Sequence, residues 1–191
     1  DEHTLRVFDA ATGDSAWHFT AGARIDAPPT IHEGAVIFGS ANGRVYCLRA
    51  ADGALGWRFD AAPRRRLIAD CSRLESAWPV PGTVLIREGK CYCAAGRSSY
   101  LDGGIRFFIL DPETGAVLDK RTICSRDPKT GKMKPTTSAQ SMEGLLNDIP
   151  GTDGKNVYIR QMKVASGGGT GGVHLYTTGG YLDASWFNRT F

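Results

Sequence analysis

The stretch LRAADGALGWRF at residues 48–59 repeats FDAATGDSAWHF at residues 8–19, forty residues earlier. A third copy, LDPETGAVLD at residues 110–119, keeps the Thr-Gly pair but has Asp119 where a tryptophan is expected. A sequence motif that recurs at a fixed interval indicates that one structural unit is repeated along the chain. The identical pairs in the first two copies are Ala10/Ala50, Ala11/Ala51, Gly13/Gly53, Trp17/Trp57 and Phe19/Phe59.

The complete unit contains four short β-rich runs separated by turn residues. The runs are APPTIHEG, AVIFGSANG, RVYCLRA and ALGWRFD, between residues 27 and 60. Gly, Asn and Asp between such runs are typical of antiparallel hairpins. Four strands, A to D, in about forty residues are the size of a propeller blade. No segment has a sustained 3.6-residue apolar period, so the sequence predicts an all-β fold rather than a helical solenoid.

Two residue types in the repeat have a structural interpretation. Gly13, Gly53 and Gly115 close the turn between strands C and D, where a positive φ is costly for residues with a Cβ. Trp17 and Trp57 follow on strand D, four residues after the first two of these glycines. We expect each ring to fill the wedge between neighbouring blades rather than to bind a ligand.

Length and composition exclude several classes of function. The chain has 191 residues and a net charge of +3, too weak to indicate binding to nucleic acid or to an anionic membrane surface. The one basic run, Arg64-Arg65-Arg66, is interpreted as a solvated loop. No apolar stretch approaches the ~20 residues that span a bilayer. The chain opens with Asp-Glu-His, without an initiator methionine or a signal-peptide core, so we expect it to be part of a longer polypeptide.

The five cysteines do not indicate whether the protein works in an oxidising or a reducing compartment. Cys47 takes a strand position equivalent to Val7, which favours a small buried hydrophobe. Cys91 and Cys93 are two apart on a strand and lack the spacing of a zinc site. Two cysteines in irregular segments, Cys71 and Cys124, could pair, and the odd total predicts at least one free thiol.

The insertions between repeats fall in particular connections. Gly53 to Gly115 spans 62 residues, 22 more than the interval from Gly13 to Gly53. Of the excess, 15 residues precede strand B and 7 lie between strands B and C, in AAGRSSYLDGG. A fourth unit is expanded at SRDPKTGKMKPTTSAQSMEG and at ASGGGTGG.

These connections are all of the D–A or B–C type, which antiparallel geometry places on one face of the propeller. Loops on a rigid scaffold commonly carry function, so one hypothesis is a binding face. Tolerated surface insertions are the alternative. Arg97 and Asp102 could also simply pair across their own loop. The candidate ligand-binding residues on these loops and near the end of the chain are Glu75, Trp78, Arg97, Tyr100, Asp102, Asp183, Trp186 and Arg189.

The repeat boundaries give a predicted organisation of one propeller segment. Residues 1–20 form the end of one blade, residues 21–60 a full blade and residues 61–123 an enlarged blade. Residues 124–191 form a degenerate or partial blade. We therefore expect three to four blades in an open arc, a fragment of a longer chain that supplies the remaining blades.

The signature A-x-[TD]-G-x-x-x-W, preceded by GSANGRVYCL, resembles the repeat of pyrroloquinoline-quinone (PQQ)-type β-propellers. That superfamily includes quinoprotein dehydrogenases and the lipoprotein scaffold of outer-membrane protein assembly. LESAWPVPGTVLI, CAAGRSSYLDGG and HLYTTGGYLDASWFNRT further resemble a group of long bacterial PQQ-like propeller proteins, some with a methyltransferase-like domain. The resemblance covers nearly the whole chain and implies the fold more specifically than any activity.

Known catalytic motifs are not found in the sequence. There is no H-E-x-x-H, G-x-S-x-G, phosphate loop or EF-hand, and the four histidines lack a paired metal spacing. In the quinoprotein dehydrogenases, PQQ lies on the propeller axis with calcium held by acidic and amide side chains and with an aspartate base. No such constellation can be matched here, so the sequence predicts no catalytic residue, no metal and no cofactor.

The function expected from the resemblance is a non-catalytic binding or scaffolding module of a periplasmic or otherwise extracytoplasmic bacterial protein. Its partners would be the remaining blades and a protein or small-molecule ligand on the long D–A and B–C loops, with no nucleic acid and no membrane span. The alternative is part of a PQQ-dependent alcohol or sugar dehydrogenase, which would use PQQ with calcium. A more remote third hypothesis is a carbohydrate-processing propeller.

Overall fold

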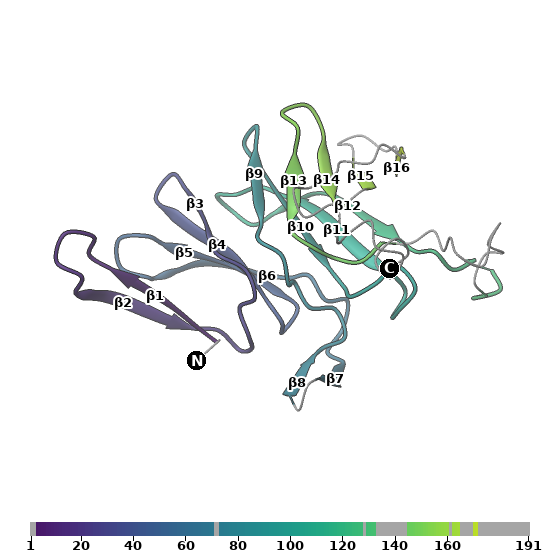
Figure 1. The fold of residues 1–191 in the computed structure, drawn as a ribbon, viewed down its shortest axis with the longest axis horizontal. Coiled ribbons are helices and arrows are strands. Elements are labelled where there is room, and N and C mark those ends of the chain that lie inside the picture. Colours follow the sequence, from purple (N-terminus) through teal and green to yellow (C-terminus); the bar gives the residue numbers. More distant parts are fainter. Residues whose placement is uncertain are drawn as a thin grey trace, which may run out of the picture.

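The computed structural model describes residues 3–70, 73–127, 129–132, 145–160, 162–164 and 170–171. Within these residues the regular structure consists of β-strands in antiparallel sheets, and the sheets follow one another in chain order as an open arc (Figure 1). The all-β, blade-like architecture predicted from the repeat is thereby confirmed.

The first sheet has two strands, β1 (Thr4–Phe8) and β2 (Ser15–Thr20). Its tight turn is held by Asp9, whose carboxylate accepts the backbone N–H groups of Ala11 and Thr12 at 2.8 and 2.9 Å. Gly13 completes this turn with a φ of +78°. These two strands correspond to strands C and D of the repeat.

The second sheet is the complete repeat, with the strand order β3-β4-β5-β6. The two middle strands are mostly buried, whereas β6 alternates between exposed and half-buried residues as an outer strand does. Ile37, Phe38 and Leu48 of the middle strands are completely buried. The strands are β3 (Thr30–His32), β4 (Ala35–Ser40), β5 (Arg44–Arg49) and β6 (Leu55–Asp60).

The third and fourth sheets repeat the same meander, in the orders β9-β10-β11-β12 and β13-β14-β15-β16. The third consists of β9 (Leu85–Arg87), β10 (Lys90–Ala95), β11 (Ile105–Leu110) and β12 (Val117–Ile123). The fourth has shorter strands, namely β13 (Pro150–Thr152), β14 (Val157–Ile159), β15 (Met162–Val164) and β16 (Thr170–Gly171).

A separate hairpin, β7 (Leu67–Asp70) and β8 (Arg73–Ser76), lies in the connection between the second and third sheets. It occupies the segment where the repeat comparison located extra residues before strand B. The hairpin projects from the arc at the bottom of Figure 1. Leu67 and Leu74 are exposed on it, at 48% and 69%.

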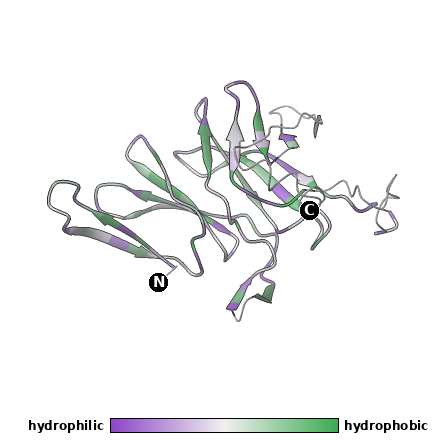
Figure 2. Ribbon diagram, in the orientation of Figure 1, coloured by the Kyte–Doolittle hydropathy of each residue, from purple (hydrophilic) through white to green (hydrophobic). Residues whose placement is uncertain are grey.

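The core lies between successive sheets. Figure 2 shows hydrophobic residues mainly along the strands and hydrophilic residues mainly at turns and loops. One buried cluster joins the second and third sheets through residues such as Ile37, Cys47, Cys91 and Phe108. Two further clusters join the first sheet to the second and the third to the fourth. Stability therefore depends on each sheet covering its neighbour, as in other repeat folds.

The tryptophan of one sheet contacts the turn of the next. Trp17 Nε1 donates a hydrogen bond to the carbonyl oxygen of Ala50 at 2.9 Å. A Cβ at Gly53 would lie 2.6 Å from the Trp17 ring, closer than real Cβ contacts come. Gly53 is thus required by the neighbouring ring as well as by its φ of +72°.

The same contact recurs one repeat later. Trp57 Nε1 donates to the carbonyl oxygen of Pro112 at 2.9 Å, and a Cβ at Gly115 would lie 2.7 Å from the Trp57 ring. Both tryptophan rings are half-buried rather than fully buried. In the third sheet Asp119 occupies the equivalent position, where its carboxylate pairs with Arg121 at 2.7 Å.

Four cysteines lie in the described residues as free thiols. Cys47, Cys91 and Cys93 are buried, and Cys124 is exposed. Burial raises the pKa of the Cys91 thiol to about 12. Cys71, the predicted possible partner of Cys124, lies outside the described residues.

Candidate binding face

The long loops gather on one end of the sheets because of the antiparallel order of the strands. The loop from β10 to β11 (residues 96–104) and the connection from β6 to β9 (residues 61–84) leave from the same end. The short β5–β6 and β11–β12 turns lie at the opposite end. We call the end with the long loops the loop face and the other the turn face.

Asp102 joins the two long loops of the loop face. Its carboxylate pairs with Arg66 at 2.8 Å and with Arg97 at 2.7 Å, and its side chain is only 9% exposed. Its carbonyl oxygen accepts the indole N–H of Trp78 at 2.9 Å. The backbone φ of +54° is unusual for a residue with a side chain and is held by these contacts. Arg97 and Asp102 thus pair across their own loop, the alternative to ligand binding that the sequence left open.

Trp78 and Glu75 lie inside the molecule rather than on its surface. Trp78 is 3% exposed, and the guanidinium carbon of Arg64 lies 5.7 Å from the centre of its ring. Glu75 is 5% exposed and pairs with Arg24 at 2.6 Å. Both residues therefore fix the loops in place, and any ligand role for them stays a prediction.

The loop face is also tied to the connection that leads to the fourth sheet. The carbonyl oxygen of Tyr100 accepts Nε of Arg126 at 2.7 Å, and Ser99 Oγ accepts the backbone N–H of Leu145 at 2.8 Å. Asn147 donates from its side-chain amide to the carbonyl of Ala94 at 2.8 Å. Sequence reasoning did not single out Asn147, because its partner lies 53 residues away.

Three candidate residues near the end of the chain, Asp183, Trp186 and Arg189, lie outside the described residues. Their predicted role in binding stays a prediction.

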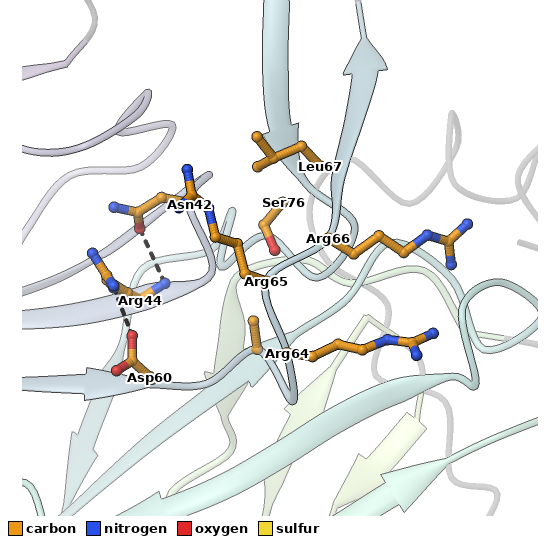
Figure 3. A pocket seen from close by; sticks show the side chains of 9 residues that line it. Asn42, Arg44, Asp60, Arg64, Arg65, Arg66, Leu67 and Ser76 are labelled. Carbon is orange, nitrogen blue, oxygen red and sulfur yellow. Dashed lines mark hydrogen bonds and ion pairs between the residues drawn. The ribbon is translucent and has the colours of Figure 1, made fainter.

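A pocket of about 390 Å³ opens on the loop face between the second sheet and the β7–β8 hairpin (Figure 3). The basic run interpreted as a solvated loop is exposed, and it also forms one wall of this pocket. On the opposite wall, Arg44 Nε pairs with Asp60 at 2.6 Å. The lining residues are Asn42, Arg44, Asp60, Ala62, Arg64, Arg65, Arg66, Leu67 and Ser76.

Among the residues that the structure describes, no three His, Cys, Asp or Glu side chains are grouped closely enough to hold a metal ion. The described part of the chain also has no helix that is long and apolar enough to cross a membrane.

Solved structures with a similar fold include two quinohemoprotein alcohol dehydrogenases. The quinohemoprotein alcohol dehydrogenase from Comamonas testosteroni matches with a TM-score of 0.61 and 16% identity, over 84% of this chain and 26% of that protein. The quinohemoprotein alcohol dehydrogenase ADHIIG from Pseudomonas putida HK5 matches with a TM-score of 0.51 and 20% identity, over 70% of this chain and 19% of that one. At these identities the likeness shows the fold alone.

BamB from Moraxella catarrhalis also matches, with a TM-score of 0.46 and 19% identity, over 86% of this chain and 40% of that protein. The chain thus spans less than half the length of each of these structures. No curated protein matches the chain by sequence. The family model described as "Outer membrane protein assembly factor BamB" matches residues 1–166, and the chain, with its PQQ-like repeats, belongs to that family.

Proposed function

We propose that the chain is a non-catalytic binding or scaffolding module of a PQQ-like propeller, with the loop face as its ligand surface. The observation that carries the proposal is the continuous set of contacts across this face. Asp102 joins the β6–β9 connection to the β10–β11 loop through Arg66, and Ser99 joins that loop to the next connection through Leu145. Loops fixed in this way present a preformed surface, which lowers the entropic cost of binding.

The family description supports a role outside the cytoplasm, because outer membrane protein assembly takes place there. We infer that the module acts in the periplasm or another extracytoplasmic compartment and packs against further blades of its own propeller. Residues 1–20, 21–60, 61–123 and 124–191 would then be successive blade segments of that propeller.

The face assignment can be tested by site-specific photo-crosslinking in cells that produce the full-length protein. A photoreactive amino acid replaces Leu101 on the loop face, and a matched substitution replaces Glu113 in the turn of the same sheet. Leu101 is 42% exposed, and Glu113 is also exposed, so neither substitution disturbs the core. We expect adducts from position 101 and few from position 113. Equal adducts from both positions would contradict the assignment.

The alternative activity is tested in parallel on the same protein. The purified protein is incubated with PQQ and calcium, and dye-linked oxidation of ethanol and glucose is measured. We expect no turnover above the protein-free control. Turnover with stoichiometric PQQ would replace the scaffolding proposal with the dehydrogenase, whatever the crosslinking shows.

A further inference from the structure

The three consecutive arginines before β7 have different surroundings. Arg66 is paired with Asp102 at 2.8 Å, and the Arg64 guanidinium lies against the ring of Trp78. Arg65 has no carboxylate partner among the described residues. Figure 3 shows its side chain directed toward Asn42, whereas those of Arg64 and Arg66 extend together in another direction. The middle arginine therefore brings an uncompensated charge to the pocket.

The wall opposite Arg65 carries a second guanidinium. Arg44 lies at the start of β5 and pairs through Nε with one carboxylate, Asp60, whose side chain is 62% exposed. Asp60 is the one carboxylate among the residues that line the pocket, and it pairs with Arg44 rather than with Arg65. Arg44 and Arg65 line the same pocket, and two like charges that share a pocket produce a local field that attracts an anion.

Three of the lining residues, Asn42, Ala62 and Ser76, are held by close packing or hydrogen bonds. A Cβ at Gly43 would lie 2.7 Å from Cβ of Ala62 and 2.9 Å from Oγ of Ser76, so these groups are in tight contact. Ser76 is 3% exposed. The Asn42 amide is oriented by its hydrogen bond to the Tyr46 hydroxyl at 2.7 Å. These contacts fix that part of the pocket wall, and small-ligand sites are usually largely preformed.

We propose that this pocket binds an oxyanion group, a phosphate or a carboxylate, between Arg44 and Arg65. The planar guanidinium presents paired N–H donors that match both kinds of group. The volume of about 390 Å³ is within the range of small-ligand sites, so it accommodates the anionic end of a larger ligand. This inference rests on the proposed function, because it names the chemistry that the loop face recognises.

Isothermal titration calorimetry on the full-length protein tests the proposal with two probes, inorganic phosphate and an acetylated, amidated triglutamate peptide. Arg65→Ala removes one guanidinium, Arg44→Ala removes the other, and Arg65→Lys keeps the charge but loses the planar fork. Arg6→Ala is the matched control, because Arg6 is exposed on β1 and outside the pocket. Thermal melts verify that each variant is folded.

We expect at least one probe to bind and Arg65→Ala and Arg44→Ala each to raise its Kd about tenfold or more, the usual effect of losing a charged hydrogen bond. Arg65→Lys should be intermediate and Arg6→Ala within about twofold of the unaltered protein. Tighter phosphate binding would indicate a phosphorylated ligand, and tighter peptide binding an acidic one.

The proposal is overturned if neither probe binds, or if Arg6→Ala weakens binding as much as Arg65→Ala does. In the first case crosslinks from position 101 would still support the binding face, so failure of the pocket and failure of the proposed function can be told apart.

Discussion

The turn glycines offer a comparison in which backbone strain and side-chain collision can be separated. Gly13 and Gly115 occupy the same position of the same turn, with φ values of +78° and +71°. Replacing either with alanine places a Cβ in the left-handed region, at a cost of roughly 1–2 kcal/mol. Around Gly13 a Cβ would meet nothing within 4 Å, whereas at Gly115 it would lie 2.7 Å from the ring of Trp57.

The collision at Gly115 adds to this strain. The ring must move by roughly 1 Å to restore an ordinary contact distance. Its Nε1 is held by the carbonyl of Pro112 at 2.9 Å, so the movement also strains that hydrogen bond. Overpacking of this kind costs typically ~1–3 kcal/mol. We therefore expect Gly13→Ala to lower the free energy of unfolding by ~1–2 kcal/mol and Gly115→Ala by ~2–5 kcal/mol.

Urea unfolding of the 191-residue chain, followed by circular dichroism, measures the difference. A double-mutant cycle with Trp57→Ala assigns it, because the extra cost of Gly115→Ala should disappear once the ring is gone. Trp57→Ala by itself should lower the melting temperature, since the half-buried ring joins two sheets. Equal costs for Gly13→Ala and Gly115→Ala, or an extra cost that persists without Trp57, would refute the proposed contact between sheets.

Two further predictions follow from the ionisable groups. A thiol reagent at pH 8 should modify Cys124 in the native protein but modify Cys47, Cys91 and Cys93 only after unfolding. The reason is that burial excludes the reagent and raises the pKa of Cys91 to about 12. Peptide mapping identifies the modified cysteines, and rapid modification of Cys91 in the native protein would contradict the described core. The hydrogen bond from Arg49 lowers the pKa of Asp52 from 3.8 to about 2, so the stability that this pair contributes is present above about pH 4 and is lost as the pH falls through about 2. Carbon-detected NMR titration should show an Asp52 pKa of about 2, and Arg49→Gln should return that pKa toward 3.8. An Asp52 pKa still near 2 in the Arg49→Gln variant would rule out the arginine as the cause.

The blades could be predicted from the sequence because the features that define them are local. Gly53 lies four residues before Trp57, and both recur forty residues after Gly13 and Trp17. The periodic turn chemistry specifies each hairpin without reference to distant residues. The β7–β8 hairpin was not predicted, because it interrupts the repeat and has no second copy for comparison.

The candidate site could be predicted only in part, because its contacts join residues distant in sequence. Arg97 and Asp102 are five residues apart, so their pairing was foreseeable. Glu75 is neutralised by Arg24, 51 residues earlier, and no periodicity connects those two positions. A charged or aromatic residue in a loop looks available for binding until its distant partner is known.

In the basic run, the pairing of Arg66 with the carboxylate of Asp102 leaves Arg65 as the arginine whose charge is available to a ligand. The sequence has three adjacent arginines and no acidic residue beside them, a pattern typical of a solvated loop. In the structure Arg66 pairs with Asp102, 36 residues further on, and the Arg64 guanidinium lies over the ring of Trp78. These two contacts order the segment and leave Arg65 directed toward Asn42 across the pocket (Figure 3). The same loop contacts that remove Trp78 and Asp102 from the surface therefore create the charged pocket, so the structural role of those residues and the binding role of the loop face are parts of one arrangement.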